Sequence, residues 1–274
     1  MTLLQAAVLG VVQGLTEWLP VSSTAHLILV PWLLGWEVDR EVLLPFNALV
    51  QDGTLVAVLV YFRRDLAATA RGWVGGIRRR APLGTPEARL GWWILLGTLP
   101  AVAAGLAFEE GIGALHSRPV VVASVLLGAT AVLFLAERAG AARRGTDSLR
   151  ARDALLVGAA QAVALVPGVS RSAATIAGGM LIGLDRVAAA RFAFLLSVPV
   201  MAAAGAWETA ALLRGPDPAR HLPALAVGFA AAAVVGFATI HWLLGYLARR
   251  PLTDFAWYRI LAGAGLLALA LARG

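Results

Sequence analysis

QGLTEWLPVSST, residues 13–24, and QAVALVPGVSRS, residues 161–172, are the two stretches that decide how this chain folds. Each consists of a Gln, an apolar run, a Pro and then a hydroxyl cluster, and each is surrounded by strongly apolar sequence. Paired interruptions at corresponding places in the two halves of a chain indicate a site near the midplane of a membrane. We call these two stretches motif one and motif two.

The composition is that of an integral membrane protein. Of the 274 residues, 59% are hydrophobic and 14% are charged, whereas a soluble domain carries about 25% charged residues. The formal net charge is +7, but most of the Arg residues lie between apolar runs, where they indicate membrane topology and not nucleic-acid binding. The chain contains no Cys, which excludes a disulfide framework and a thiolate metal site.

Six apolar runs reach or approach the roughly 20 residues that a membrane-spanning helix needs. Arg residues crowd the connections at 63–89, 138–152 and 249–250, and the positive-inside rule places these connections in the cytoplasm. The orientation then alternates consistently along the chain. The expected spans are residues 44–62, 91–108, 119–137, 187–210, 222–247 and 255–272.

The segments that carry the motifs, residues 1–36 and 153–184, are each too short for two full spans and are broken by Pro. Segment 153–184 lies between two cytoplasmic connections, so we expect it to enter and leave on the same side as a re-entrant hairpin. An odd number of crossings in each half then turns the second half upside down. We therefore predict an all-α polytopic membrane protein forming one integral membrane domain (1–274). Its six transmembrane helices and two re-entrant helical hairpins would form inverted-topology repeats over 1–137 and 153–272.

Each motif is expected to start a half-helix whose N-terminus points into the protein. Pro20 and Pro167 stop the preceding helices, and the Ser residues that follow suit the N-cap position. Two helix N-termini that meet there would bind an anion, and Arg171 adds a bidentate cation suited to phosphate. A single Ser in a membrane helix more often only caps or packs, but six hydroxyls in two matched motifs favour a substrate site. These hydroxyls are Ser22, Ser23, Thr24, Ser170, Ser172 and Thr175.

Charged and polar residues of motif one add candidates for chemistry. A carboxylate in apolar sequence needs a partner, and for Glu17 we expect Arg171 of motif two. The pair is either structural or part of a site in which Glu17 accepts a proton or binds a metal. Gln13 lies four residues earlier on the same helix face, where it can orient Glu17 or hold a substrate oxygen.

His26 lies three residues after Ser23, so we expect their side chains to share a helix face. A hydroxyl beside an imidazole is the minimal unit of nucleophilic catalysis, and His26 is alternatively the acid for a leaving oxygen. Asp52, a charge within an apolar run, either faces the same cavity or marks a break near Gly53. The catalytic candidates are Glu17, Ser23, His26 and Arg171.

QGLTEWLPVSSTAH (13–26) and PGVSRSAAT (167–175) resemble the two signature motifs of the bacterial undecaprenyl-diphosphate phosphatases, also called the bacitracin-resistance family. The resemblance extends in length and hydropathy along the whole chain. It implies hydrolysis of undecaprenyl diphosphate to undecaprenyl phosphate and inorganic phosphate, which recycles the lipid carrier for peptidoglycan synthesis and confers bacitracin resistance. It also implies inverted repeats with two re-entrant hairpins in the bacterial inner (plasma) membrane, and an active site that faces the outer side.

Matched by position, the resemblance assigns site residues and shows departures at four positions. The family associates with divalent cations, so we expect Mg²⁺ or Ca²⁺ to be held by Glu17, substrate oxygens and water. Many members have Glu where this chain has Gln13, which weakens a two-carboxylate metal site. Ala25 and Ala173 replace Gly residues, and Asp52 stands where an apolar residue is expected. The matched motif residues are Gln13, Glu17, Ser23, Thr24, His26, Ser170, Arg171, Ser172 and Thr175.

The predicted chemistry is phosphoryl transfer, in which positioning and charge stabilisation do most of the work. Ser23 or an activated water attacks the terminal phosphorus, and Glu17 or His26 moves the proton. The alternative is a transporter or flippase of prenyl phosphate lipid carriers, because inverted repeats with broken helices are also transporter architecture. The expected partners are a polyprenyl diphosphate lipid substrate and membrane lipids, and the sequence leaves the oligomeric state open, a homodimer included.

Overall fold

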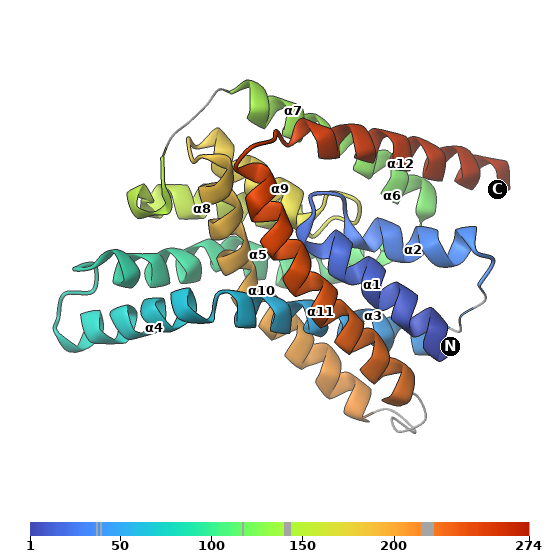
Figure 1. The fold of residues 1–274 in the computed structure, drawn as a ribbon, viewed down its shortest axis with the longest axis horizontal. Coiled ribbons are helices and arrows are strands. Elements are labelled where there is room, and N and C mark those ends of the chain that lie inside the picture. Colours follow the sequence, from blue (N-terminus) through green and yellow to red (C-terminus); the bar gives the residue numbers. More distant parts are fainter. Residues whose placement is uncertain (37, 39, 117, 140–143, 215–221, 274) are drawn as a thin grey trace.

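The structure is a computed structural model that describes residues 1–36, 38, 40–116, 118–139, 144–214 and 222–273. Within these ranges all the regular secondary structure is helical, and Figure 1 shows how the helices are arranged. The first half consists of α1 (Leu3–Trp18), α2 (Ser23–Leu33), α3 (Arg40–Tyr61), α4 (Arg63–Arg78), α5 (Pro86–His116), α6 (Pro119–Ala129) and α7 (Ala131–Arg138). The second half consists of a 3-10 turn, η1 (Thr146–Ser148), and of α8 (Ala151–Val163), α9 (Arg171–Leu181), α10 (Arg186–Arg214), α11 (Leu222–Leu247) and α12 (Thr253–Arg273).

The described residues include four helical stretches that are long and apolar enough to cross a bilayer. They correspond to four of the six predicted spans. The predicted span 119–137 is divided at Thr130 into α6 and α7. The other two predicted spans, 44–62 and 255–272, are helical in α3 and α12, and their crossing of the membrane stays a prediction. The four stretches are Pro86–Phe108, Val120–Arg138, Arg186–Ala210 and Leu222–Leu247.

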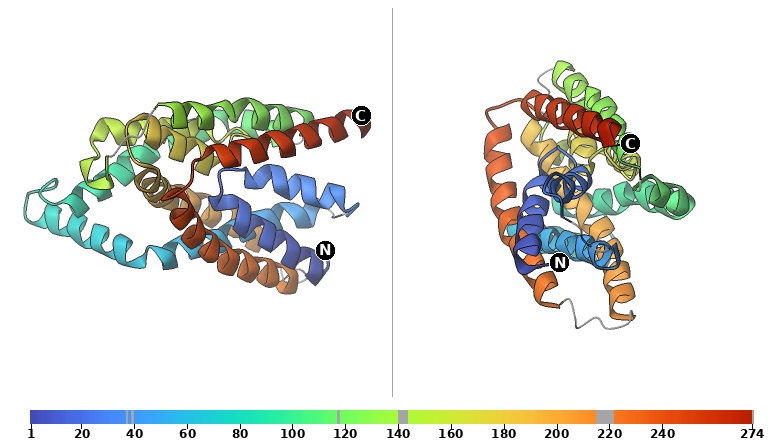
Figure 2. Two further views of the ribbon diagram at one scale, coloured as in Figure 1. Left: turned by 45° about the horizontal axis from the view of Figure 1, so that its top comes forward. Right: turned by 90° about the vertical axis from the view of Figure 1, so that its right-hand side faces the viewer.

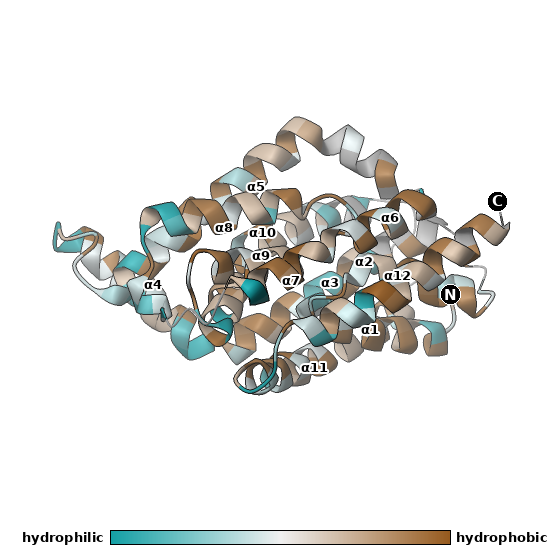
Figure 3. Cartoon of the chain, turned by 90° about the horizontal axis from the view of Figure 1, so that it is seen from above, coloured by the Kyte–Doolittle hydropathy of each residue, from teal (hydrophilic) through white to brown (hydrophobic). Residues whose placement is uncertain are grey.

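Apolar residues cover most of the helices, while hydrophilic residues concentrate around α4 and its connection to α5 (Figure 3). The sequence predicts an Arg-rich connection at residues 63–89, and the structure shows that most of this segment is helix α4. The exposed Arg63, Arg64 and Arg71 lie on this helix. The charge pattern predicted the location of this segment but not its helical structure.

Both motifs interrupt helices, as predicted from the two Pro residues. Motif one joins α1 to α2 through residues 19–22, and motif two joins α8 to α9 through residues 164–170. Pro20 and Pro167 lie in these connections, where a Pro removes no helical hydrogen bond. We call α1–α2 hairpin one and α8–α9 hairpin two; the two hairpins lie together in the middle of the molecule, with α12 running over them (Figures 1 and 2).

Glycine pairs set how the first helix of each hairpin packs. A Cβ on Gly14 of α1 would lie 2.8 Å from the backbone nitrogen of Gly236 in α11. A Cβ on Gly158 of α8 would lie 2.2 Å from the carbonyl oxygen of Gly97 in α5. Small residues allow helices in membranes to approach this closely. Hairpin one is therefore held against a helix of the second half, and hairpin two against a helix of the first half.

Polar contacts bring the ends of several helices together at one place. The carboxylate of Glu137 in α7 accepts two hydrogen bonds from the Arg186 guanidinium (2.8 and 2.6 Å) and one from the Leu252 N–H (2.6 Å). Arg144 donates to the Asp153 carboxylate at the start of α8 (2.6 Å) and to the Ile182 carbonyl at the end of α9 (2.8 Å). Both ends of hairpin two thus contact the same Arg side chain.

Candidate active site

The two half-helices α2 and α9 begin with the same unusual backbone geometry. Ser22 and Ser170 are their N-caps, with φ of 73° and 74°, a region that residues other than Gly rarely adopt. The Ser170 hydroxyl accepts the N–H of Ala173 at 3.3 Å, as an N-cap does. Ser22 stands at the corresponding N-cap position, but its side chain makes no capping hydrogen bond. The first residues of the two helices are Ser23 and Arg171.

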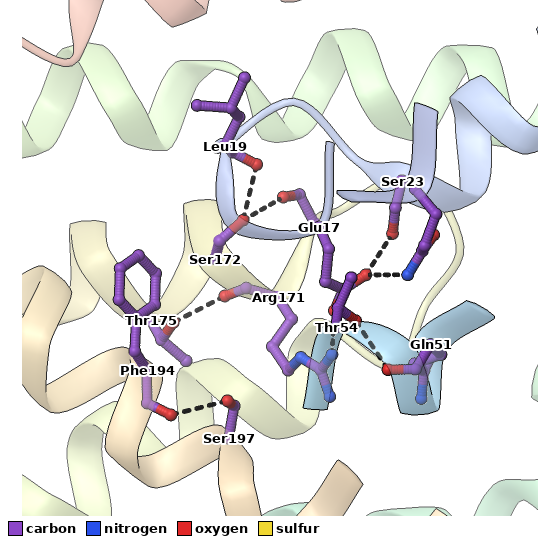
Figure 4. A network of polar contacts seen from close by, with 12 residues as sticks. Glu17, Leu19, Ser23, Gln51, Thr54, Arg171, Ser172, Thr175, Phe194 and Ser197 are labelled. Carbon is purple, nitrogen blue, oxygen red and sulfur yellow. Dashed lines mark hydrogen bonds and ion pairs between the residues drawn. The ribbon is translucent and has the colours of Figure 1, made fainter. Parts of the chain in front are cut away.

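Glu17 is the point at which the two hairpins meet. It lies in the last turn of α1, and its side chain is buried. Its Oε2 accepts hydrogen bonds from the Ser23 hydroxyl (2.7 Å) and from the Gln13 amide (3.0 Å), and its Oε1 forms an ion pair with Arg171 (Figure 4). The predicted partnership of Glu17 with Arg171 is confirmed, and Gln13 lies where it orients the carboxylate.

The hydroxyls of motif two connect the hairpins and their own helix. The Ser172 hydroxyl donates to the Leu19 carbonyl of hairpin one at 2.8 Å, and it lies 3.2 Å from the Ser170 hydroxyl. Thr175 donates to the Arg171 carbonyl one turn earlier at 2.7 Å, a bond within α9. Thr24 is partly buried in the first turn of α2.

His26 does not meet Ser23 as the sequence spacing suggested. Its Nδ1 lies 2.8 Å from the Ser22 carbonyl, and its Nε2 lies 2.6 Å from the Tyr258 hydroxyl of α12. Because a carbonyl only accepts, Nδ1 carries a proton and donates to Ser22. The structure brings Glu17, and not His26, to the Ser23 hydroxyl.

The sequence reasoning missed Tyr258 and Arg259 of α12. The Arg259 side chain is completely buried, although it lies within an expected transmembrane span. The rule that a charged residue inside an apolar run marks a functional site applies to Arg259 as it does to Glu17, and it would have identified Arg259. Tyr258 carried no comparable signal, because a Tyr near a helix end is common in membrane proteins.

Asp52 belongs to another contact. α3 is continuous from Arg40 to Tyr61, so the expected break near Gly53 is wrong. The Asp52 carboxylate accepts the Thr209 hydroxyl of α10 at 2.9 Å. Its partner is therefore on α10 and not in either motif.

The protein supplies few ligands for a metal at this site. Among the residues that the structure describes, no group of three or more His, Cys, Asp or Glu could hold a metal ion. The oxygens of Glu17 already accept bonds from Arg171, Ser23 and Gln13. A divalent cation prefers six or more oxygens, so Glu17 fits one only if substrate and water complete the coordination.

Known proteins resemble this chain over nearly its whole length. The family described as "Bacitracin resistance protein BacA" matches residues 6–265. The undecaprenyl-diphosphatase of Anaeromyxobacter dehalogenans (strain 2CP-C) is 50% identical over 274 residues, which cover 99% of this chain and 92% of that protein. The undecaprenyl-diphosphatase of Thermomicrobium roseum is 45% identical over 97% of this chain and 98% of its own length. That of Geobacter sulfurreducens is 44% identical, with complete coverage of both chains.

Proposed function

The chain belongs to the bacitracin resistance protein BacA family, and on this premise we propose that it hydrolyses undecaprenyl diphosphate at the Glu17–Arg171 pair. The products are undecaprenyl phosphate, which re-enters peptidoglycan synthesis as a lipid carrier, and inorganic phosphate. One observation carries the assignment of the site. The buried carboxylate of Glu17 contacts the Ser23 hydroxyl of its own hairpin and the Arg171 guanidinium of hairpin two. The transport alternative is not favoured, because the relatives are named as diphosphatases.

The diphosphate would bind where the two half-helices begin. The first N–H groups of α2 and α9 lack helical partners, and the positive ends of both helix dipoles favour an anion there. Arg171 is the first residue of α9 and is partly exposed, so its guanidinium can bind phosphate oxygens through two parallel hydrogen bonds. The polyprenyl chain would remain in the lipid or in a groove between the spans.

The contact between Ser23 and Glu17 supports nucleophilic attack by the Ser23 hydroxyl. Oγ would form a bond with the terminal phosphorus as its proton passes to Glu17, while the bond to the bridging oxygen breaks and undecaprenyl phosphate leaves. Water would then attack the phosphoserine, the bond to Oγ would break, and phosphate would leave as Ser23 recovers a proton. Arg171 would stabilise the charge that develops on the transferred group.

We also propose the finer architecture predicted from the sequence: six transmembrane spans, two re-entrant hairpins, and inverted repeats over residues 1–137 and 153–272. Three observations support it. The N-caps Ser22 and Ser170 have matching backbone angles, each hairpin packs through glycines on the other half, and Arg144 contacts both ends of hairpin two. With the Arg-rich connections in the cytoplasm, the site would open to the outer side of the bacterial inner membrane.

A divalent cation, Mg²⁺ or Ca²⁺, would share Glu17 with diphosphate oxygens and water, and when bound it would neutralise phosphate charge. We propose that chelation by EDTA abolishes phosphate release and that adding back either ion restores it. Full activity in EDTA, measured on metal-depleted enzyme, would contradict this part of the proposal.

The decisive test is release of inorganic phosphate from undecaprenyl diphosphate by the purified protein in detergent. We expect activity in the wild type, loss in Ser23→Ala, and retention in the matched control Ser124→Ala, which changes an exposed hydroxyl of α6 that bonds its own helix. Rapid quenching with substrate labelled on the terminal phosphate should trap a phosphoenzyme in the wild type but not in Ser23→Ala. A wild-type protein that releases no phosphate would refute the function, and activity without a trapped species would favour attack by water.

A further inference from the structure

The Arg259 guanidinium is buried completely and uses all five of its N–H donors. Nε donates to the Thr130 hydroxyl at 3.0 Å. Nη1 donates to the carbonyls of Pro20 (3.3 Å) and Val169 (3.1 Å), and Nη2 donates to the carbonyls of Leu126 (3.0 Å) and Gly168 (3.2 Å). Each acceptor is a neutral oxygen.

These five acceptors come from three interruptions of the helical backbone. Pro20 lies in the connection of hairpin one, and Gly168 and Val169 lie in that of hairpin two. Leu126 lies near the end of α6 and Thr130 lies at the break between α6 and α7, where the Thr130 N–H bonds the Leu127 carbonyl and the Thr130 hydroxyl donates to the Leu126 carbonyl. One side chain of α12 therefore joins both motifs and a third helix break.

The contacts solve two energetic problems together. A carbonyl that leaves a helix within a membrane has no water to accept from, and leaving it unpaired costs several kcal/mol. A buried guanidinium is equally unfavourable unless each donor is bonded. A Lys side chain carries three donors on a flexible stem, so it cannot serve all five acceptors.

We propose that Arg259 is a positioning residue that holds the tips of the two hairpins in register, so that Ser23 and Arg171 face one diphosphate. The expected effect on catalysis rests on the proposed function. The contacts of Arg259 with the two hairpins do not depend on that function. The hydroxyl of Tyr258, the preceding residue of α12, shares a hydrogen bond with Nε2 of His26 in hairpin one. α12 thus contacts the site through two consecutive residues without supplying a reacting group.

The kinetic test compares Arg259→Lys and Arg259→Gln with the control Arg191→Gln, which removes a partly exposed ion pair between α10 and Asp65. A displacement of about 1 Å at the reacting groups lowers catalysis by about 100-fold, so we expect kcat to fall about 30- to 100-fold in both Arg259 variants. The control should stay within about twofold of the wild type. Thermal unfolding in detergent, measured on the same variants, separates misplacement of the reacting groups from a general loss of folded protein. If the loss of phosphate release only follows the loss of folded protein, Arg259 has no positioning role.

A structural test uses the absence of Cys from the chain. Spin labels on Leu33→Cys and Leu181→Cys, at the exposed far ends of α2 and α9, report the distance between the hairpins by double electron–electron resonance. We expect the width of the distance distribution to double at least in Arg259→Lys and to be unchanged in Arg191→Gln. An unchanged distribution together with wild-type kcat would overturn the proposal. A broadened distribution in a protein that hydrolyses no diphosphate would refute the proposed function and leave the positioning role standing.

Discussion

Hairpin one and hairpin two share a backbone plan but carry different chemistry. Both start their second helix from a Ser with φ near 74°, and the next residue of each contacts the same carboxylate, Glu17. In hairpin one this residue is Ser23, and in hairpin two it is Arg171. In the proposed mechanism this difference is a division of labour: hairpin one would supply the attacking group, and hairpin two the positive charge.

The carboxylate itself is present in one hairpin. Gln13 and Gln161 stand 9 residues before the N-caps Ser22 and Ser170 respectively, but four residues after Gln161 the chain has Leu165 instead of an acid. Gln13 donates to Glu17, whereas neither amide atom of Gln161 has a hydrogen-bond partner among the described residues. The proposed mechanism uses one base for one nucleophile, so it requires no second carboxylate in hairpin two.

The largest effect should follow from removing the base of hairpin one. Glu17→Gln keeps the shape of the side chain but cannot accept the Ser23 proton, and general-base catalysis is worth about 10²- to 10⁴-fold. We expect kcat for phosphate release to fall about 10³-fold, with KM changed by less than about threefold. Thermal unfolding in detergent checks that the variant is folded. Activity within tenfold of wild type would remove Glu17 from the mechanism.

Replacing the cation of hairpin two should have the next largest effect. Arg171→Lys keeps the charge but loses the planar fork, so we expect kcat/KM to fall about 100-fold. Arg171→Ala leaves Glu17 buried without its cation, which should also lower the free energy of unfolding by about 3 kcal/mol. The double variant Glu17→Gln with Arg171→Ala should recover most of that stability but no activity. Recovery of activity would show that the pair is only structural.

The sequence predicted the parts of this comparison that follow from local rules. Pro20 and Pro167 located the helix breaks, and burial of a charge in apolar sequence identified Glu17 and Arg171 as partners. Helical spacing placed His26 beside Ser23, but spacing within one helix cannot show that Tyr258 competes for the imidazole from a distant segment. Such contacts depend on tertiary packing, which no single motif contains.

A smaller effect should follow from removing the hydrogen bond between Tyr258 and His26. His26 belongs to hairpin one, and Ala174 occupies the equivalent position in hairpin two. Tyr258→Phe removes the hydrogen bond to Nε2 but keeps the stacked ring, whose centroid lies 5.6 Å from the imidazole. A hydrogen bond of this kind is worth about 1 kcal/mol, so we expect kcat to fall about fivefold. The same substitution at partly buried Tyr61 of α3, whose hydroxyl lies 3.3 Å from His241 Nδ1, serves as control. Equal losses in both variants would show that the effect of Tyr258 is general.

The smallest effects come from the matched glutamines, and they test the asymmetry most directly. Gln13→Leu removes a donor to Glu17, so we expect kcat to fall about threefold, since one hydrogen bond to a charged group that keeps two others contributes modestly. Gln161→Leu should leave kcat unchanged and raise the free energy of unfolding by about 1 kcal/mol, because it removes buried amide atoms that have no partner in the described structure. Phosphate release and urea unfolding measured on both variants provide the comparison. If Gln161→Leu lowers kcat as much as Gln13→Leu does, then hairpin two contributes its glutamine to the substrate, and the division of labour between the hairpins is less complete than their contacts with Glu17 indicate.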